Sequence, residues 1–163
     1  MIIYLIRHAI AEEAAVWQGK DETRPLTREG MEKMREIAAG LSVVVSGFDQ
    51  VCSSPLTRAR QTAEILARQF KFKGDLLIWE ELTPGAKPQN LEKKLKSLDG
   101  PAVALVGHEP HLGYAMSYFL TGKEDILRLD FKKAGVCCIE YDGSVPATLL
   151  WFIPPKISRT MKP

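Results

Sequence analysis

The sequence predicts an α/β fold of three layers, in which helices flank a mostly parallel central sheet. Residues 1–6 and 102–107 are continuous apolar runs, the pattern of strands that are covered on both faces. Strand-like and helix-like segments alternate along the chain, which favours a parallel sheet with helical connections. The 163 residues, 45% of them hydrophobic, fit one domain with a substantial core. We expect residues 1–155 to form this domain and residues 156–163 to be a loosely held tail.

Hydrophobic periodicity and end signals define the elements of the first half. Thr27 is placed to cap a helix whose apolar side chains recur at helical spacing up to Leu41. Residues 48–55 (FDQVCSSP) indicate a second, short strand. Ser54 and Pro55 would then be the cap and the first-turn proline of the next helix.

The second half continues the alternation. Residues 76–82 (LLIWEEL) indicate a third strand, and Asn90 is placed to cap a short helix. Residues 108–122 carry the clearest helical pattern in the chain, closed by Gly122. Residues 135–153 should form two strands around Asp142-Gly143, a hairpin at or near an edge of the sheet.

Charge and cysteine content exclude several classes of function. The 22 Lys and Arg residues against 20 Asp and Glu residues give a net charge of +2, so no overall field calls for nucleic acid or an anionic membrane as partner. Three cysteines, two of them adjacent, do not make a disulfide framework, which fits a reducing cytoplasm. No apolar stretch is long enough to span a bilayer, and no signal peptide is evident. We expect a cytoplasmic protein whose basic groups act locally.

Polar side chains stand at the predicted carboxyl ends of three strands, where ligands bind in open α/β sheets. They are Arg7 and His8 after the first strand, Ser53 and Ser54 with Arg58 after the second, and His108 after the fourth. One such histidine alone would most simply be a capping or partly buried residue. Two histidines together with two arginines favour a functional site.

Both arginines occupy positions that are unfavourable for a cation. Arg58 falls in the first turn of a helix, at the positive end of its dipole, and a surface carboxylate is the simplest partner for it. Arg7 ends a buried strand, and no acidic residue precedes Glu12. A bound phosphate would satisfy both guanidinium groups through bidentate hydrogen bonds. The pattern therefore predicts a phosphate site.

The histidines suit phosphoryl transfer at such a site. A neutral imidazole can attack phosphorus and hold the phosphoryl group covalently. We expect His8 to be this nucleophile, kept neutral near pH 7 by the arginine charges, against an ordinary pKa of about 6.5. His108, cationic or as a donor, would hydrogen-bond a non-bridging oxygen and stabilise the transferring group. This chemistry calls for no metal and no cofactor.

Five motifs distributed over the chain resemble those of a known family. LIRHA at 5–9, SSPLTRARQTAE at 53–64 and VGHEPHLG at 106–113 are similar to the histidine phosphatase superfamily, which has a phosphoglycerate mutase-like fold. RPLTREG at 24–30 and ELTPG at 81–85 resemble its small SixA-type phosphohistidine phosphatases.

The resemblance implies roles for individual residues. His8 would accept the phosphoryl group, Arg7 and Arg58 would clamp the phosphate, and His108 would be the second histidine of the pocket. Ala9 departs from the glycine that is usual in the family, and its Cβ limits the loop backbone and the approach of a ligand. Glu80 and Glu81 stand where larger relatives carry a proton donor.

The implied activity is that of a metal-independent phosphatase acting on phosphohistidine in a protein, through a phosphohistidine on the enzyme itself. An imidazole is a far weaker base than an alkoxide, so it leaves with less help from a proton donor. The partner would be a phosphohistidine-bearing protein or a small phosphorylated metabolite. Two alternatives stay open: a general small-molecule phosphomonoesterase of the same superfamily, and a module that binds phosphate or phosphohistidine without turning it over.

Two rival sites also fit parts of the sequence. Cys52 and Arg58 have the C-x5-R spacing of cysteine-dependent phosphatases, but Pro55 removes a backbone donor of such a loop, so Cys52 is more simply a small buried residue. His8, His108 and His111 could bind zinc, but we expect His111 to be a helix-start residue. Lys132 and Lys133 are most simply solvated, although a basic rim could steer a negatively charged partner.

Overall fold

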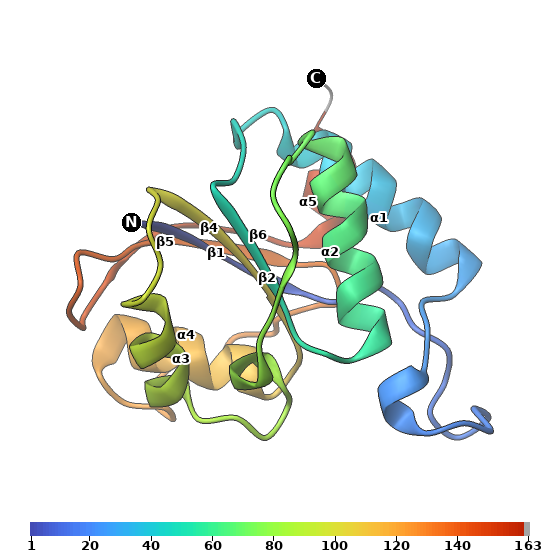
Figure 1. Cartoon of the computed structure of the whole chain (residues 1–163), viewed down its shortest axis with the longest axis horizontal. Coiled ribbons are helices and arrows are strands. Elements are labelled where there is room, and N and C mark those ends of the chain that lie inside the picture. The colour runs from blue at the N-terminus through green and yellow to red at the C-terminus, as the bar shows by residue number, and fades with distance from the viewer. Residues whose placement is uncertain (162–163) are drawn as a thin grey trace.

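A six-stranded sheet separates two layers of helices (Figure 1). The computed structural model describes residues 1–161. The strands, in the spatial order β3-β2-β4-β1-β5-β6, are β1 (Ile2–Arg7), β2 (Gln50–Ser53), β3 (Leu77–Ile78), β4 (Ala102–Gly107), β5 (Val136–Glu140) and β6 (Thr148–Ile153). β1, β2, β3 and β4 pair in parallel, whereas β5 is antiparallel to both β1 and β6. The predicted α/β class with a mostly parallel sheet is confirmed.

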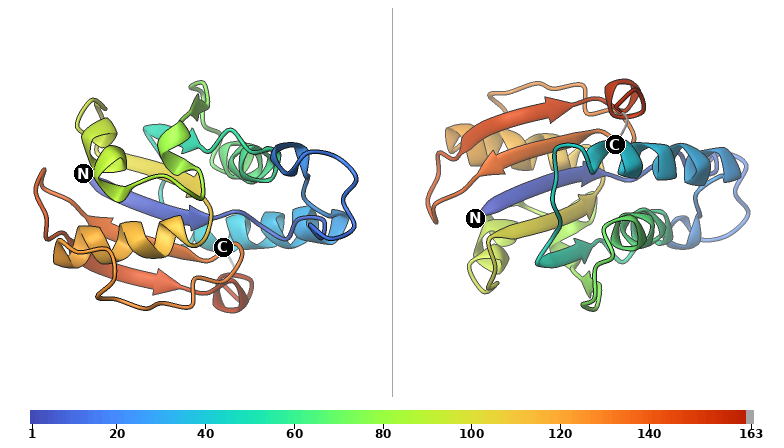
Figure 2. Two further views of the ribbon diagram at one scale, coloured as in Figure 1. Left: turned by 90° about the horizontal axis from the view of Figure 1, so that it is seen from below. Right: turned by 90° about the horizontal axis from the view of Figure 1, so that it is seen from above.

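Helices cover both faces of this sheet, as the two views of Figure 2 show. The helices on one face are α1 (Arg28–Leu41), α2 (Thr57–Gln69) and the short α5 (Pro155–Ser158), and those on the other are α3 (Pro88–Leu95) and α4 (His111–Thr121). Two 3₁₀ turns complete the fold, η1 (Asp21–Thr23) and η2 (Glu80–Leu82).

The apolar run of β1 supplies both layers of the core. Because side chains alternate across a strand, Ile3 and Leu5 join the cluster under α3 and α4, whereas Tyr4 and Ile6 join the one under α1 and α2. β4 alternates in the same way. These two strands are adjacent in the middle of the sheet, which fixes where the residues after them must lie.

Several predicted element ends agree with the structure. The Thr27 hydroxyl accepts a hydrogen bond from the Gly30 N–H at 2.9 Å and caps α1. Gly122 ends α4 in the left-handed conformation, with φ of 77°. The last two strands form an antiparallel pair with β6 at the sheet edge, although residues 141–147 make a longer connection than a tight turn.

Three other element ends were predicted wrongly. α2 begins at Thr57 rather than at Pro55, with Leu56 as its N-cap in an extended conformation; the Ser54 hydroxyl accepts a 3.4 Å bond from the Leu56 N–H and lies 2.9 Å from Nε2 of His108. The third strand stops at Ile78, and η2 follows it, with the Leu82 N–H donating to the Trp79 carbonyl. α3 begins at Pro88, whose fixed φ favours a first helical turn, so Asn90 lies inside the helix.

The C-terminal segment is packed more closely than the predicted loose tail. Ser158 in α5 is fully buried, and a Cβ added to Gly40 of α1 would clash with the Ser158 carbonyl oxygen. Arg159 adds an ion pair of 2.7 Å with Glu36 of α1. Lys162 and Pro163, also part of the predicted tail, lie outside the described residues. None of the helices within residues 1–161 is both long enough and apolar enough to cross a bilayer.

Candidate active site

The register of the sheet brings the predicted site residues to one edge. Arg7 of β1 is paired with Gly107 of β4, and Ser53 of β2 with Val106, so the three strands end together. The next residues along each strand are His8, Ser54 and His108. The ring centroids of His8 and His108 lie 5.0 Å apart. Two imidazoles that are far apart in the sequence therefore meet, as the sequence predicts.

His8 is held in one tautomer. The residue is 6% exposed, and Nδ1 of its ring lies 2.7 Å from the Ala9 carbonyl oxygen. Because a carbonyl only accepts, Nδ1 carries the proton and Nε2 keeps its lone pair. Burial lowers the pKa of His8 to about 3, against the opposing effect of this hydrogen bond, and the charges of Arg58 and Arg7 lower it further. His8 is thus neutral near pH 7, but burial contributes more to this than the arginines do.

His108 is also neutral. It is 2% exposed, and burial, followed by the neighbouring His8 and Arg58, lowers its pKa to about 2. Of the two forms of His108 that the sequence allowed, the cation is therefore disfavoured. The neutral ring, which can still donate a hydrogen bond, is the form expected near pH 7. Nε2 lies 2.9 Å from the Ser54 hydroxyl oxygen, while Nδ1 is buried without a partner. Because a hydroxyl can donate or accept, either ring nitrogen of His108 can carry the proton.

Arg58 is buried and anchored by a carboxylate. Its side chain is 4% exposed, with Nη1 donating to the Asp21 carbonyl at 2.9 Å and Nη2 to the Asp21 carboxylate at 3.0 Å. The anion that its helix position predicts is thus at least in part a protein carboxylate. Sequence reasoning missed Asp21, because it belongs to η1, 37 residues earlier, and no local signal links the two.

Arg7 is also stabilised by segments that are remote in sequence. Its Nη1 donates to the Phe131 carbonyl at 2.7 Å, and its Nε is buried without a partner. Burial lowers the pKa of Arg7, whereas the charges of Glu109 and Asp130 raise it. No acidic residue is close to Arg7 in the sequence, but the fold brings these two carboxylates near it.

The loop after β1 is fixed through its backbone. The Ala134 N–H, in a residue with φ of 62°, donates to the carbonyls of Arg7 at 3.0 Å and His8 at 3.2 Å. The Ala9 N–H donates to the Thr62 hydroxyl at 3.1 Å. Lys71 and Ala134 are the only non-glycine residues with positive φ in the described chain. Ala9 is outside that region, so the backbone conformation tolerates its Cβ.

Neither predicted acid is hydrogen-bonded to the histidines. Glu80 is exposed, and Glu81 lines a surface pocket with Lys93 and Lys94. Their turn does lie beside the end of β4, since the Leu82 carbonyl oxygen would be 3.2 Å from a Cβ on Gly107. The role of either glutamate as a proton donor stays a prediction.

The two rival sites do not form. Cys52 is fully buried, and burial raises the pKa of its thiol to about 12, so it is not a thiolate near pH 7. Within residues 1–161, no group of three His, Cys, Asp or Glu side chains is placed to hold a metal ion. His111 is instead the fully buried first residue of α4, as expected.

Ser54→Ala is expected to lower kcat about fivefold to tenfold, because the ring of His108 loses the hydroxyl that orients it. Turnover of p-nitrophenyl phosphate by the purified variant measures this effect. Ser53→Ala is the matched control, since Ser53 is equally buried but its hydroxyl donates to the Ser54 carbonyl at 2.9 Å. Equal rates for the two variants would contradict the positioning role of Ser54.

The buried histidines also predict that acid destabilises the fold. Burial lowers the pKa values of His8, His108 and His111 to about 3, 2 and 4. Below about pH 6.5 the unfolded chain takes up protons that the folded chain does not, so stability falls with falling pH, by at most about 1.4 kcal/mol per pH unit for each histidine.

Urea unfolding between about pH 7 and about pH 5 measures how the free energy of unfolding changes with pH. Ordinary carboxyl groups have pKa values of about 4, so most of them stay ionised over this range. His111→Gln should reduce the slope by up to about one third, because one of the three buried imidazoles is gone. A free energy of unfolding that is constant over this range would contradict the account.

Comparisons with known proteins indicate the family of the chain. The sequence profile of the histidine phosphatase superfamily (branch 1) matches residues 3–83. The chain is 36% identical over 143 residues to an uncharacterized protein of Picosynechococcus sp., covering 83% of this chain and 82% of that one. It is 26% identical over 158 residues to the phosphohistidine phosphatase SixA of Escherichia coli K12, covering 95% of this chain and 94% of that one.

A solved structure shares the fold. The protein histidine phosphatase SixA complexed with tungstate has a TM-score of 0.85 to this structure at 24% identity, covering 96% of this chain and 99% of that one. The profile match includes Arg7 at the end of β1, His8 directly after it, and Arg58 in the first turn of α2. On this sequence and structural likeness, the chain belongs to branch 1 of the histidine phosphatase superfamily, resembles its SixA-type members throughout its length, and is a phosphatase.

Proposed function

We propose that this phosphatase removes phosphate from phosphohistidine on a protein, with His8 as the residue that accepts the phosphoryl group. One observation carries the proposal: a buried, neutral His8 has its Nδ1 proton bonded to the Ala9 carbonyl, which leaves the Nε2 lone pair for attack. A second buried imidazole, that of His108, lies beside it with ring centroids 5.0 Å apart.

Three buried nitrogens without partners support a phosphate clamp around this nucleophile: two are arginine donors, and the third, in His108, is a donor when it carries the ring proton. Nε of Arg7, Nε of Arg58 and Nδ1 of His108 are buried nitrogens without hydrogen-bond partners. An unsatisfied buried polar group costs about 1–3 kcal/mol, so such atoms favour a ligand that offers acceptors. Phosphoryl oxygens are acceptors, and arginine binds them in planar, charge-assisted pairs. We infer that Arg7 and Arg58 hold the phosphate and that His108 donates to one of its oxygens.

The reaction then proceeds in two displacements. Solvent first protonates the other ring nitrogen of the substrate imidazole. Nε2 of His8 then attacks phosphorus, the bond from phosphorus to the substrate nitrogen breaks, and a neutral imidazole leaves. Water next attacks the phosphoryl group on His8, loses a proton to solvent, and releases inorganic phosphate with His8 restored. The arginines and His108 stabilise the charge that spreads over the three equatorial oxygens in both steps.

The leaving group is the reason to favour phosphohistidine over a phosphate ester. An alkoxide needs a placed acid, but neither Glu80 nor Glu81 is hydrogen-bonded to the site histidines. An imidazole is a much weaker base, so it leaves without one. The similarity to a relative named phosphohistidine phosphatase supports the same assignment.

A substrate comparison tests the proposal. A phosphohistidine-bearing protein, a phosphotyrosine peptide and sugar phosphates are offered to the purified protein under one condition, with and without a strong chelator. We expect kcat/KM for phosphohistidine to exceed the others by at least about tenfold, which corresponds to 1.4 kcal/mol, and the chelator to have no effect. Faster turnover of sugar phosphates would instead favour a small-molecule phosphomonoesterase.

A further inference from the structure

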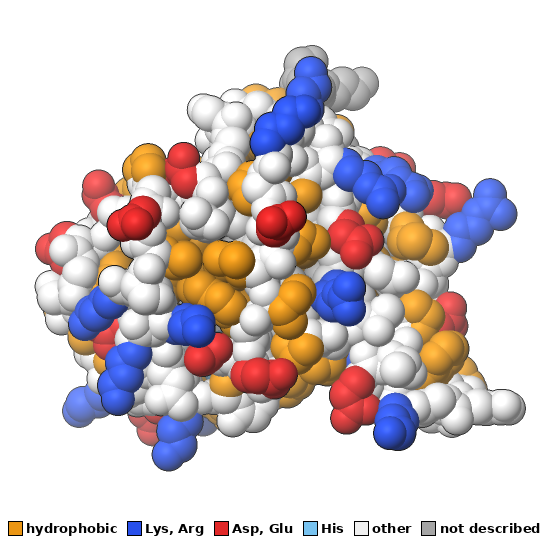
Figure 3. Space-filling view, in the orientation of Figure 1, with side chains coloured by type: hydrophobic (Ala, Val, Ile, Leu, Met, Phe, Trp, Pro, Cys, Tyr) orange, Lys and Arg blue, Asp and Glu red, His pale blue; other side chains and the backbone are white. Residues whose placement is uncertain are grey.

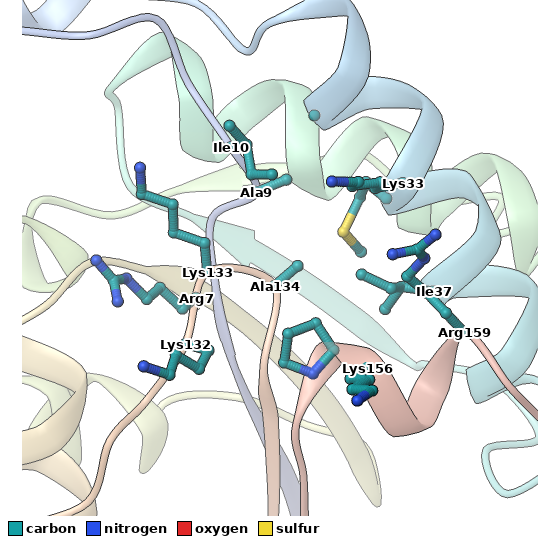
Figure 4. Close-up of a pocket in the computed structure, with 13 residues that line it drawn as sticks. Arg7, Ala9, Ile10, Lys33, Ile37, Lys132, Lys133, Ala134, Lys156 and Arg159 are labelled. Atoms are coloured by element: carbon teal, nitrogen blue, oxygen red, sulfur yellow. The ribbon is translucent and has the colours of Figure 1, made fainter.

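We propose that a basic groove beside the phosphate site binds an acidic, partly apolar segment of the substrate protein and thereby selects which phosphohistidine is dephosphorylated. The inference rests on the proposed function, because it assigns the partner of the same site. The groove has a volume of about 770 Å³ and is lined by Arg7 and Ala9, which flank His8 (Figure 4). A protein that presents its phosphohistidine to His8 therefore lies within reach of the groove.

Cations from separate parts of the fold surround this groove. Its lining contains six basic residues and no acidic one: Arg7, Lys33, Lys132, Lys133, Lys156 and Arg159. Figure 4 shows Lys132 and Lys133 on the same side as Arg7, with Lys33 and Arg159 on the opposite side. By contrast, acidic and basic side chains are mixed over the face in Figure 3. The net charge of the whole chain is only +2, so this is a local concentration of positive charge.

Part of that charge has no counter-charge nearby. Lys33, Lys132 and Arg159 each pair with a carboxylate that does not line the groove. For Lys133 and Lys156, no carboxylate of the described residues lies within 4.0 Å. These two lysines are exposed, so they can meet the carboxylates of an approaching partner with little loss of hydration.

Between the cations the groove is apolar. The lining side chains without charge are Ala9, Ile10, Met34, Ile37, Ala134 and Pro155. Most ligand sites combine such an apolar surface with a few polar groups, and their volumes are about 300–1,000 Å³. A segment that alternates acidic with apolar side chains is complementary to this surface.

The arrangement favours a polypeptide over a second phosphate group. A phosphate group is bound by donors that converge on one point, most specifically by the planar donor pair of arginine, whereas lysine is a flexible point charge. Here four of the six cations are lysines, and they are distributed on both sides of the groove rather than directed at one point. Carboxylates spaced along a chain can pair with such lysines separately.

Peptides of opposite flanking charge test this inference. Two peptides each carry one central phosphohistidine. In the acidic peptide it is flanked by Asp, Glu and Leu, and in the basic peptide by Lys, Ser and Leu. We expect the wild-type protein to turn over the acidic peptide with a kcat/KM about tenfold higher, as a few exposed charge pairs allow. Lys33→Glu with Lys156→Glu should abolish this preference. Lys156→Glu alone, which removes no intramolecular ion pair of the described residues, should reduce it.

The matched control is Lys73→Glu with Lys93→Glu, which changes the net charge equally at exposed lysines outside the groove and should keep the preference. Free phosphohistidine should be hydrolysed at the same rate by all of these proteins. Equal turnover of the two peptides by the wild type, or an unchanged preference in both groove variants, would overturn the inference.

A binding measurement separates this inference from the proposed function. A fluorescent, unphosphorylated acidic peptide should bind the wild type and the control, but bind the groove double variant at least about tenfold more weakly, by anisotropy. Such binding without turnover of either phosphohistidine peptide would contradict the proposed function and leave the groove assignment standing. Turnover of phosphohistidine without any dependence on flanking charge would contradict the groove alone.

Discussion

His8→Ala is expected to lower kcat by at least about a thousandfold, because the variant has no group that can take over the phosphoryl group. No other imidazole is assigned this role: His108 contacts Ser54 through Nε2 and is proposed to donate to a phosphoryl oxygen through Nδ1, and His111 is a buried helix residue. The measurement is single-turnover hydrolysis of a phosphohistidine peptide, with p-nitrophenyl phosphate as a second substrate.

The matched control for this variant is Cys52→Ala. Cys52 is fully buried and its thiol is protonated, so its removal should leave kcat within about twofold of the wild type, with a small loss of stability from the smaller side chain. If His8→Ala retained activity while Cys52→Ala lost it, the nucleophile would have been assigned to the wrong residue.

Arg58→Ala is the second substitution with a large expected effect. We expect kcat/KM to fall by about 100-fold to 1,000-fold, the usual result of removing one placed donor to a developing oxyanion. Arg58→Lys should recover only part of this loss, because lysine keeps the charge but lacks the planar pair of donors. Steady-state kinetics with a phosphohistidine peptide give both values.

Arg60→Ala is the matched control, because Arg60 is an exposed arginine two residues further along α2 and should change activity by less than about twofold. Thermal unfolding of Arg58→Ala checks the fold. Asp21 keeps its 2.8 Å pair with Arg24 in that variant, so η1 retains an anchor. Wild-type kcat/KM in a folded Arg58→Ala variant would rule out its role in the clamp.

The sequence predicted those parts of the site that depend on strand order and strand ends. The apolar runs of β1 and β4 mark central strands, and the carboxyl ends of adjacent parallel strands share one edge. His8 and His108 therefore meet for a reason that is visible in the chain. Helix ends were less predictable, because Ser54 and Asn90 are good caps by residue type but are used differently in the folded protein.

Contacts between remote segments could not be predicted. Asp21 accepts a hydrogen bond from Arg58, the Phe131 carbonyl accepts one from Arg7, and the Thr62 hydroxyl accepts one from the Ala9 N–H. Each pair is far apart in the sequence, and no hydrophobic periodicity indicates such a contact. The cause of the low pKa of His8 was likewise misjudged. Charge is visible in a sequence, but the burial that contributes most to this shift depends on how the surrounding segments pack.

Trapping the covalent intermediate tests the central claim most directly. The protein is mixed with a phosphohistidine substrate and quenched in alkali, and the phosphorylated peptide is sequenced by mass spectrometry. We predict a phosphoryl group on Nε2 of His8, formed and lost at the rate of turnover and absent from His8→Ala. A phosphoryl group on any other residue, or steady turnover with none on His8, would contradict the account.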